Sequence, residues 1–174
     1  GAGPAGLAAA EAARLSGARV VLAEQRPTLG GALAGEADGL DDWIAGIAAG
    51  FDGEDARLLL RTTVTGYYDH DVLVAVERVA DHRRTPEPHQ PRQRLWVVRA
   101  REVVLATGAH EQPLLFAHND RPGIMLSGAV RHYLHAHAVV PGRRVVVATA
   151  TDDGYRTALD LARAGVEVPA IVDA

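Results

Sequence analysis

The sequence predicts an α/β fold built on a parallel sheet, with an inserted antiparallel segment and a second strand–helix–strand unit near the end of the chain. Three observations predict it. A glycine-rich turn leads into an alanine-rich helix and a short apolar run, β-rich runs fill the middle of the chain, and an apolar run, a helical segment and another apolar run follow one another after residue 143.

The composition excludes several classes of function. With 174 residues, 48% of them hydrophobic, the chain can bury a core. Its net charge of -4 offers no basic face, so we expect neither nucleic acid nor a membrane surface as a partner. With no cysteine, the chain has no disulfide or thiolate metal site. No apolar run approaches the roughly 20 residues of a membrane span, and we expect a cytoplasmic protein.

The chain opens with the sequence GAGPAG, which satisfies the GxGxxG fingerprint. In such a turn Gly1 allows a tight bend, Gly3 lets the backbone approach a pyrophosphate, and Gly6 lets the following helix pack closely on a strand. The helix over residues 7–15 then directs its N-terminal N–H groups at the phosphates. The motif predicts a Rossmann-type dinucleotide-binding domain.

An acidic residue strengthens this prediction. Glu24 ends the apolar run 19–23, about 20 residues after the fingerprint, where a carboxylate accepts hydrogen bonds from the adenosine ribose. A carboxylate there repels the 2′-phosphate of NADP, although Arg26 lies nearby. The spacing leaves both NAD and FAD open, because each presents an ADP half to the same unit.

The fingerprint normally follows a β-strand, so we expect a first strand before Gly1 and a chain that is a window on a longer protein. After the turn at residues 28–31, Asp41 and Asp42 predict the start of a helix to residue 49. Residues 57–100 predict an antiparallel meander interrupted by a solvated loop at 83–92. Residues 102–106 predict a buried parallel strand that ends at Thr107 and Gly108.

We therefore predict a dinucleotide-binding domain over residues 1–112, a linker and helix over 113–142, and a second βαβ unit over 143–174 that resembles the first in layout. Ser127 is expected to cap the linker's helix, which runs to about residue 137. The second unit carries ATATDDG in place of the glycine fingerprint. Asp152 and Asp153 would repel a diphosphate, so we expect no nucleotide there.

Several motifs together resemble a known family. The fingerprint, the Gly30–Gly31 pair and VLATG at 104–108 are similar to the two-dinucleotide-binding-domain flavoproteins. TTVTGYYDH at 62–70, PRQRLW at 91–96 and NDRPGIM at 119–125 resemble the α subunit of heterotetrameric sarcosine oxidase. The resemblance spans nearly the whole chain.

The resemblance implies NAD in this domain, FAD in the β subunit, and a covalent FMN between the two. It also implies β, γ and δ subunits as partners, and an enzyme that oxidises sarcosine to glycine, reduces O2 to H2O2 and delivers a one-carbon unit to tetrahydrofolate. The implied cofactor-binding residues are Gly1, Gly3, Ala5 and Gly6 at the pyrophosphate, Glu24, Gln25 and Arg26 around the ribose, Gly31 and Ala32 behind the second strand, Val64 at the adenine edge, and Thr107 and Gly108 on the returning strand. The family commonly shows Asp then Glu at the ribose, where this chain has Glu24 and Gln25.

Two alternatives remain open: an FAD-binding electron-transfer subunit of a related amine or opine dehydrogenase, and a non-catalytic scaffold stabilised by a dinucleotide. The sequence indicates no catalytic residue and no metal site. His132, His135 and His137 form an HxxHxH pattern that we interpret as surface or packing residues. His70 and His110, near strand ends, are more simply turn residues than cofactor contacts.

Overall fold

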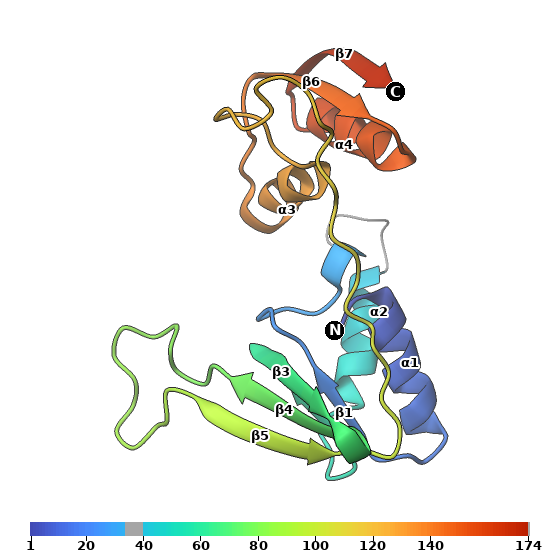
Figure 1. Ribbon diagram of the computed structural model, residues 1–174, viewed down its shortest axis with the longest axis vertical. Helices are drawn as coiled ribbons and strands as arrows, with labels where there is room; N and C mark the ends of the chain where they lie inside the picture. Colours follow the sequence, from blue (N-terminus) through green and yellow to red (C-terminus); the bar gives the residue numbers. More distant parts are fainter. Residues whose placement is uncertain (34–39, 174) are drawn as a thin grey trace. The chain divides into compact units, whose positions relative to one another are not determined.

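The computed structural model describes residues 1–33 and 40–173 of the chain. These residues form two compact units, Gly1–Gly108 and Ala109–Ala174. Figure 1 shows the order of their elements along the chain. Each unit has its own buried core.

The first unit begins with a helix and a strand. Helix α1 (Pro4–Leu15) has a proline in its first turn, where a missing N–H costs no helical hydrogen bond. Strand β1 (Val20–Ala23) follows it, then the 3-10 turn η1 (Gly31–Leu33) and helix α2 (Leu40–Ala49), whose first turn holds Asp41 and Asp42 as expected. The core of this unit consists of Ala2, Leu7, Ala10, Leu22, Ile47, Phe51 and Ala56.

Strand β2 (Ala56–Leu59) corrects the predicted meander. It pairs in parallel with β1, from Val20 opposite Ala56 to Ala23 opposite Leu59, and so belongs to the parallel sheet. Like the strands that follow, it is a short run that contains apolar residues. Composition gives the strand type but not the pairing partner, which here is set by the packing of β1 and β2 with α1 and α2 in the core.

The antiparallel meander consists of β3 (Thr62–Tyr68), β4 (Val72–Glu77) and β5 (Arg94–Arg99), in that order. The 3-10 turn η2 (Asp69–Asp71) joins β3 to β4, and a register shift interrupts β3 between Val64 and Gly66. Between β4 and β5, residues 83–92 form neither helix nor strand and are mostly exposed, as predicted. The meander is the green and yellow-green sheet of Figure 1.

The predicted buried strand at residues 102–106 is wrong. The segment has no strand pairing, and the side chains of Val104 and Leu105 are 70% and 71% exposed. A strand needs a neighbour that supplies its ladder hydrogen bonds, and no strand of the described chain pairs with this segment. The pairing that would bury its apolar side chains is not made.

The second unit is a βαβ motif preceded by a helix. Helix α3 (Ser127–His137) is followed by β6 (Arg144–Thr149), α4 (Asp152–Arg163) and β7 (Glu167–Asp173), with β6 and β7 paired in parallel. Its core consists of Val130, Val147, Ala158, Leu161 and Val166.

Ser127 does not cap α3, contrary to the prediction. Leu126 occupies the cap position, and the carboxylate of Glu111 accepts hydrogen bonds from the backbone N–H groups of Ser127 and Gly128, at 2.9 and 2.7 Å. The hydroxyl of Ser127 instead lies 2.5 Å from that of Thr157 on α4. A charged acceptor from a separate segment thus replaces the expected local cap.

Candidate functional site

The glycine turn before α1 is closely packed. A Cβ on Gly6 would lie 1.8 Å from the carbonyl oxygen of Gly1, and one on Gly1 would lie 2.3 Å from the carbonyl oxygen of Ala106. Real Cβ atoms do not approach backbone this closely, so both positions require glycine. Gly6 therefore has the packing role that its place in the fingerprint predicts.

Gly3 has a different environment. It is the N-cap residue of α1, and a Cβ placed on it would meet nothing within 4 Å. The first helical hydrogen bond runs from the N–H of Leu7 to the carbonyl oxygen of Gly3, so helix geometry leaves the N–H groups of Ala5 and Gly6 without an acceptor one turn earlier. No acidic side chain lies in this first turn. Open space beside a positive helix end fits a pyrophosphate.

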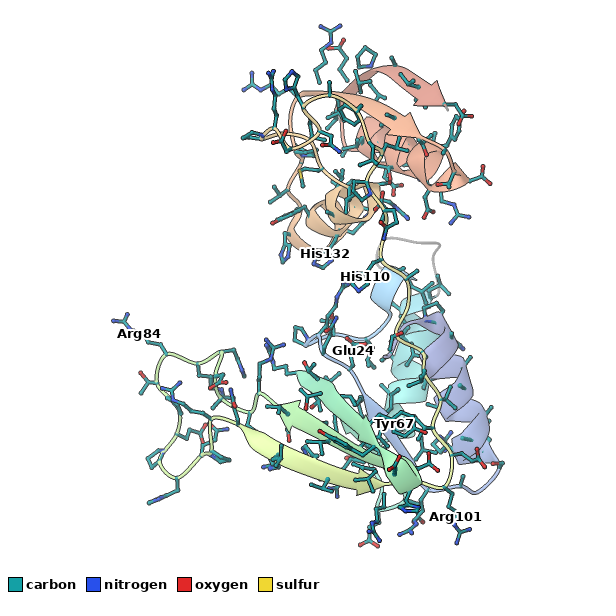
Figure 2. The ribbon with its side chains drawn as sticks, in the orientation of Figure 1. Glu24, Tyr67, Arg84, Arg101, His110 and His132 are labelled. Atoms are coloured by element: carbon teal, nitrogen blue, oxygen red, sulfur yellow. The ribbon has the colours of Figure 1, made fainter. Side chains whose placement is uncertain are left out.

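Glu24 follows β1 directly and is only 7% exposed, although it is charged. One carboxylate oxygen accepts a hydrogen bond from the N–H of Ala2 at 2.6 Å, and the other accepts one from the N–H of Arg26 at 2.8 Å. Figure 2 labels Glu24 at this end of β1. The structure thus brings the predicted ribose acceptor onto the glycine turn.

A second turn, at Gly30 and Gly31, packs against the glycine turn. The N–H of Gly30 donates to the carbonyl oxygen of Ala2 at 2.9 Å, and a Cβ on Gly31 would lie 2.9 Å from the Cα of Gly3. Gly31 also has a φ of 58°, which disfavours any residue with a side chain. Ala32 follows in η1 and is exposed.

Gln25 and Arg26 are exposed beside Glu24 and are held mainly through their backbones. The carbonyl oxygen of Gln25 accepts a hydrogen bond from the Arg78 guanidinium at 2.8 Å, and that of Arg26 accepts one from the N–H of Arg61 at 3.0 Å. These bonds tie the end of β1 to the meander. They leave the side chains of Gln25 and Arg26 on the surface of the unit.

The other predicted cofactor residues lie on two segments. Val64 is on β3, opposite Ala75, and its side chain is 45% exposed. Thr107 and Gly108 are exposed, and the Cα of Thr107 would lie 3.6 Å from a Cβ on Gly1. The segment that ends in Gly108 therefore passes the glycine turn, although it is not a strand.

Three residues that shape this loop are not among the predicted cofactor-binding residues. Ala2 is fully buried and uses both its N–H and its carbonyl oxygen, Gly30 bonds it from one side, and Arg78 anchors Gln25. Ala2 and Gly30 carried a signal, since they stand between and beside residues of recognised motifs. Arg78 carried none, because only the pairing of β3 with β4 brings it to β1.

The second unit repeats the spacing of the fingerprint with other residues. Thr149, Thr151 and Gly154 occupy the places of the three glycines. A Cβ on Gly154 would lie 2.3 Å from the Cβ of Thr149, so the packing glycine is kept. The Thr149 hydroxyl donates to the carbonyl oxygen of Thr151 and accepts from its N–H, at 2.7 and 3.1 Å. The hydroxyl therefore already accepts from the N–H of Thr151, which is the backbone donor that a phosphate would need.

The three histidines of the HxxHxH pattern do not converge on a common site. The Nε2 atom of His135 lies 3.0 Å from a carboxylate oxygen of Asp160, while the rings of His132 and His137 stand edge to face at 5.4 Å. In the described part of the chain, no group of three or more histidine, aspartate or glutamate side chains is placed to hold a metal ion.

His70 and His110 are both exposed and lie in different units. His70 lines an open hollow of about 320 Å³ at the β3–β4 connection, together with Tyr67, Tyr68, Asp69 and Asp71. None of these residues belongs to the glycine turn. Among residues 1–33 and 40–173, no helix is both long and apolar enough to span a bilayer.

Comparison with known proteins identifies close relatives. The chain is 50% identical to the alpha subunit of sarcosine oxidase from Corynebacterium sp. (strain P-1), over all of this chain and 19% of that protein. It is 46% identical to the protein of the same name from Rhizobium meliloti (strain 1021), over 99% of this chain and 18% of that protein. The chain thus spans about a fifth of the length of these relatives.

A more distant relative and a solved structure also match nearly the whole chain. An opine oxidase subunit of Agrobacterium tumefaciens (strain Ach5) is 31% identical over 99% of this chain and 35% of that protein. The crystal structure of L-proline dehydrogenase from P. horikoshii matches 99% of this chain and 34% of its own with a TM-score of 0.74 and 25% identity. Residues 1–124, which include the glycine turn, Glu24 and the meander, match the family of FAD dependent oxidoreductases. The chain belongs to the FAD dependent oxidoreductase family.

Proposed function

We propose that the first unit binds the ADP half of a dinucleotide at the glycine turn. The observation that carries this proposal is the open space at Gly3, beside an α1 terminus that holds no acidic side chain and next to the buried carboxylate of Glu24. The residues proposed to surround the dinucleotide are Gly1, Gly3, Ala5, Gly6, Glu24, Gln25, Arg26, Gly31, Ala32, Val64, Thr107 and Gly108. The Thr149 hydroxyl and the first-turn aspartates of α4 support the proposal that the second unit holds none.

We further propose that the chain is the NAD-binding part of a sarcosine oxidase alpha subunit. Identities of 46 to 50% along essentially the whole chain support this assignment. The complete enzyme would convert sarcosine, O2 and tetrahydrofolate into glycine, H2O2 and 5,10-methylenetetrahydrofolate. The β, γ and δ subunits are its proposed partners. The β subunit would hold FAD, and the covalent FMN would lie between the α and β subunits. A cytoplasmic location stays a prediction.

A second candidate is that the same turn holds FAD, in an electron-transfer subunit of an amine- or opine-oxidising enzyme. Two observations favour it: the matching family is described as FAD dependent, and the opine oxidase relative is 31% identical over almost the whole chain. The glycine turn and Glu24 suit both candidates, because NAD and FAD share their ADP half.

The experiment that tests these proposals is identification of the nucleotide released from the full-length subunit. The subunit is purified in isolation and with its partner subunits, denatured, and its released nucleotides are identified by mass spectrometry. NAD from the isolated subunit supports the first candidate, and FAD from the isolated subunit supports the second. Absence of both, with no binding of added NAD, FAD or ADP, rejects a dinucleotide site in this unit.

A further inference from the structure

The carboxylate of Glu24 is hydrogen-bonded to the backbone of its own chain. Its two carboxylate oxygens accept hydrogen bonds from the N–H groups of Ala2 and Arg26, at 2.6 and 2.8 Å. The bond to Ala2 is buried and joins residues 22 positions apart. A carboxylate that is 7% exposed needs such partners, because an unpaired buried charge is costly.

The opposite side of Ala2 is held as well. Its carbonyl oxygen accepts the N–H of Gly30, and Gly31 lies against Gly3, so that a Cβ there would come within 2.9 Å of the Gly3 Cα. Ala2 itself is fully buried. The turn that must meet the pyrophosphate is therefore fixed by Glu24 on one side and by the Gly30–Gly31 turn on the other.

We propose that Glu24 is a positioning residue for the glycine turn, in addition to being the acceptor for the ribose hydroxyls; this inference rests on the proposed function. An ionised carboxylate has about four acceptor positions, of which the backbone uses two, so two remain for a ribose. By holding the turn in its binding shape, Glu24 lowers the conformational entropy that binding must remove. It therefore strengthens binding of the diphosphate, which it does not touch.

The test compares two ligands on the full-length subunit freed of bound nucleotide. ADP has ribose hydroxyls, and 2′,3′-dideoxy-ADP lacks them but keeps the diphosphate. Glu24→Gln replaces one acceptor oxygen by an NH2 group, which cannot accept a backbone N–H. Glu11→Gln is the matched control, since Glu11 pairs with Arg14 in the half of α1 away from the glycine turn. Glu24→Asp, which keeps the charge on a shorter side chain, serves as the second variant.

We expect Glu24→Gln to weaken dideoxy-ADP binding by about tenfold or more, the effect of one lost charged hydrogen bond. ADP binding should weaken further, because the ribose contact is lost too. Glu11→Gln should leave both affinities within about twofold of wild type. If either Glu24 variant weakens ADP binding while dideoxy-ADP binds as it does to the wild type, the positioning role is rejected and only the ribose role stands.

A measurement without ligand separates this inference from the proposed function. Hydrogen–deuterium exchange of the peptide that includes Ala2 should be slow in the nucleotide-free wild type and faster in both Glu24 variants, with α4 peptides unchanged as an internal control. Unchanged exchange overturns the positioning role even if ADP binds. If wild-type protein binds neither ADP nor dideoxy-ADP, the proposed function fails, while the exchange data still decide whether Glu24 holds the turn.

Discussion

Gly154 lies against Thr149 so closely that a Cβ on Gly154 would stand 2.3 Å from the Cβ of Thr149. Gly6 stands in the same relation to Gly1 in the first unit, with 1.8 Å from its added Cβ to the Gly1 carbonyl oxygen. Both glycines let a helix start close to the strand or turn before it. The two units therefore share a packing requirement, although only the first keeps glycines at the other two positions of the fingerprint.

Replacing Gly154 by alanine should destabilise the second unit by about 1 to 3 kcal/mol, because the added methyl forces Thr149 or α4 to move. Urea unfolding of the full-length protein, followed by hydrogen exchange of β6 and α4 peptides, measures this. Gly46→Ala is the matched control: Gly46 lies within α2 with nothing within 4 Å of its added Cβ, so alanine there should stabilise by up to about 1 kcal/mol. Equal effects of the two substitutions would contradict the packing argument.

Gly3→Ala should separate binding from folding. Gly3 has a φ of -73° and a ψ of -177°, which alanine adopts freely, and the added Cβ meets nothing in the protein. We expect a free energy of unfolding within about 0.5 kcal/mol of wild type. We also expect at least about tenfold weaker ADP binding in titration calorimetry, because the methyl stands in the space proposed for the pyrophosphate.

Gly6→Ala is the contrasting variant, and it should impair the fold of the first unit as well as binding, since its Cβ meets the Gly1 carbonyl oxygen. Unimpaired ADP binding by Gly3→Ala would place the phosphates elsewhere.

Thr149→Val should cost about 1 to 3 kcal/mol in stability. The substitution keeps the shape of a side chain that is 6% exposed but leaves the N–H and the carbonyl oxygen of Thr151 without their hydroxyl partner. Thr149→Ser keeps the hydroxyl and loses only a methyl, so it should cost less. Chemical denaturation of the two variants beside the wild type gives the comparison, and a valine variant as stable as the serine variant would show that the hydroxyl bonds contribute little.

The ion pairs of Asp160 predict an acid-sensitive contact between α3 and α4. Burial raises the pKa of Asp160, but the hydrogen bonds and charges of His135 and Arg131 outweigh it and hold this pKa below its ordinary value of 3.8. A lowered pKa in the folded protein means that the stabilisation is complete above the unfolded value and is lost as pH falls through the folded value. We therefore expect the α3–α4 contact to loosen below about pH 4.

Asp160→Asn tests this contact at two pH values. At pH 7 it should destabilise the second unit by about 3 kcal/mol or more, because the nearly buried Arg131 loses a charged partner 2.9 Å away. Below pH 4 the variant should lose less additional protection than the wild type. Hydrogen exchange of α3 and α4 peptides between pH 3 and 7 provides the measurement, and parallel pH profiles for the two proteins would exclude a role for Asp160 in acid sensitivity.

The sequence predicted local structure better than pairing. The α1 helix, β1 and the β6–α4–β7 unit follow from alanine content, apolar runs and flanking glycines, which are local properties. The parallel partner of β2 and the unpaired state of residues 102–106 depend on which strands meet in space. Short apolar runs satisfy either arrangement, so composition could not decide between them.

The candidate site shows the same division. Glu24 and the glycines were found because their spacing carries chemical meaning. The bond from Ala2 to Glu24 and the anchoring of Gln25 by Arg78 join residues that are distant in sequence, 22 and 53 positions apart. Neither leaves a pattern along the chain, because each depends on how β1 meets the turn and the meander.

The four α-helices of the described chain differ in the acidic side chains near their N-termini. The starts of α2 and α4 carry aspartates, and that of α3 is covered by Glu111, whereas the first turn of α1 contains no acidic side chain. Three helix dipoles thus have their positive ends offset by the protein's own carboxylates. Selectivity for the anion that we propose at α1 would then depend on the absence of a carboxylate from the first turn as well as on the glycines that make room, so an aspartate introduced at Ala5 should compete with the phosphates.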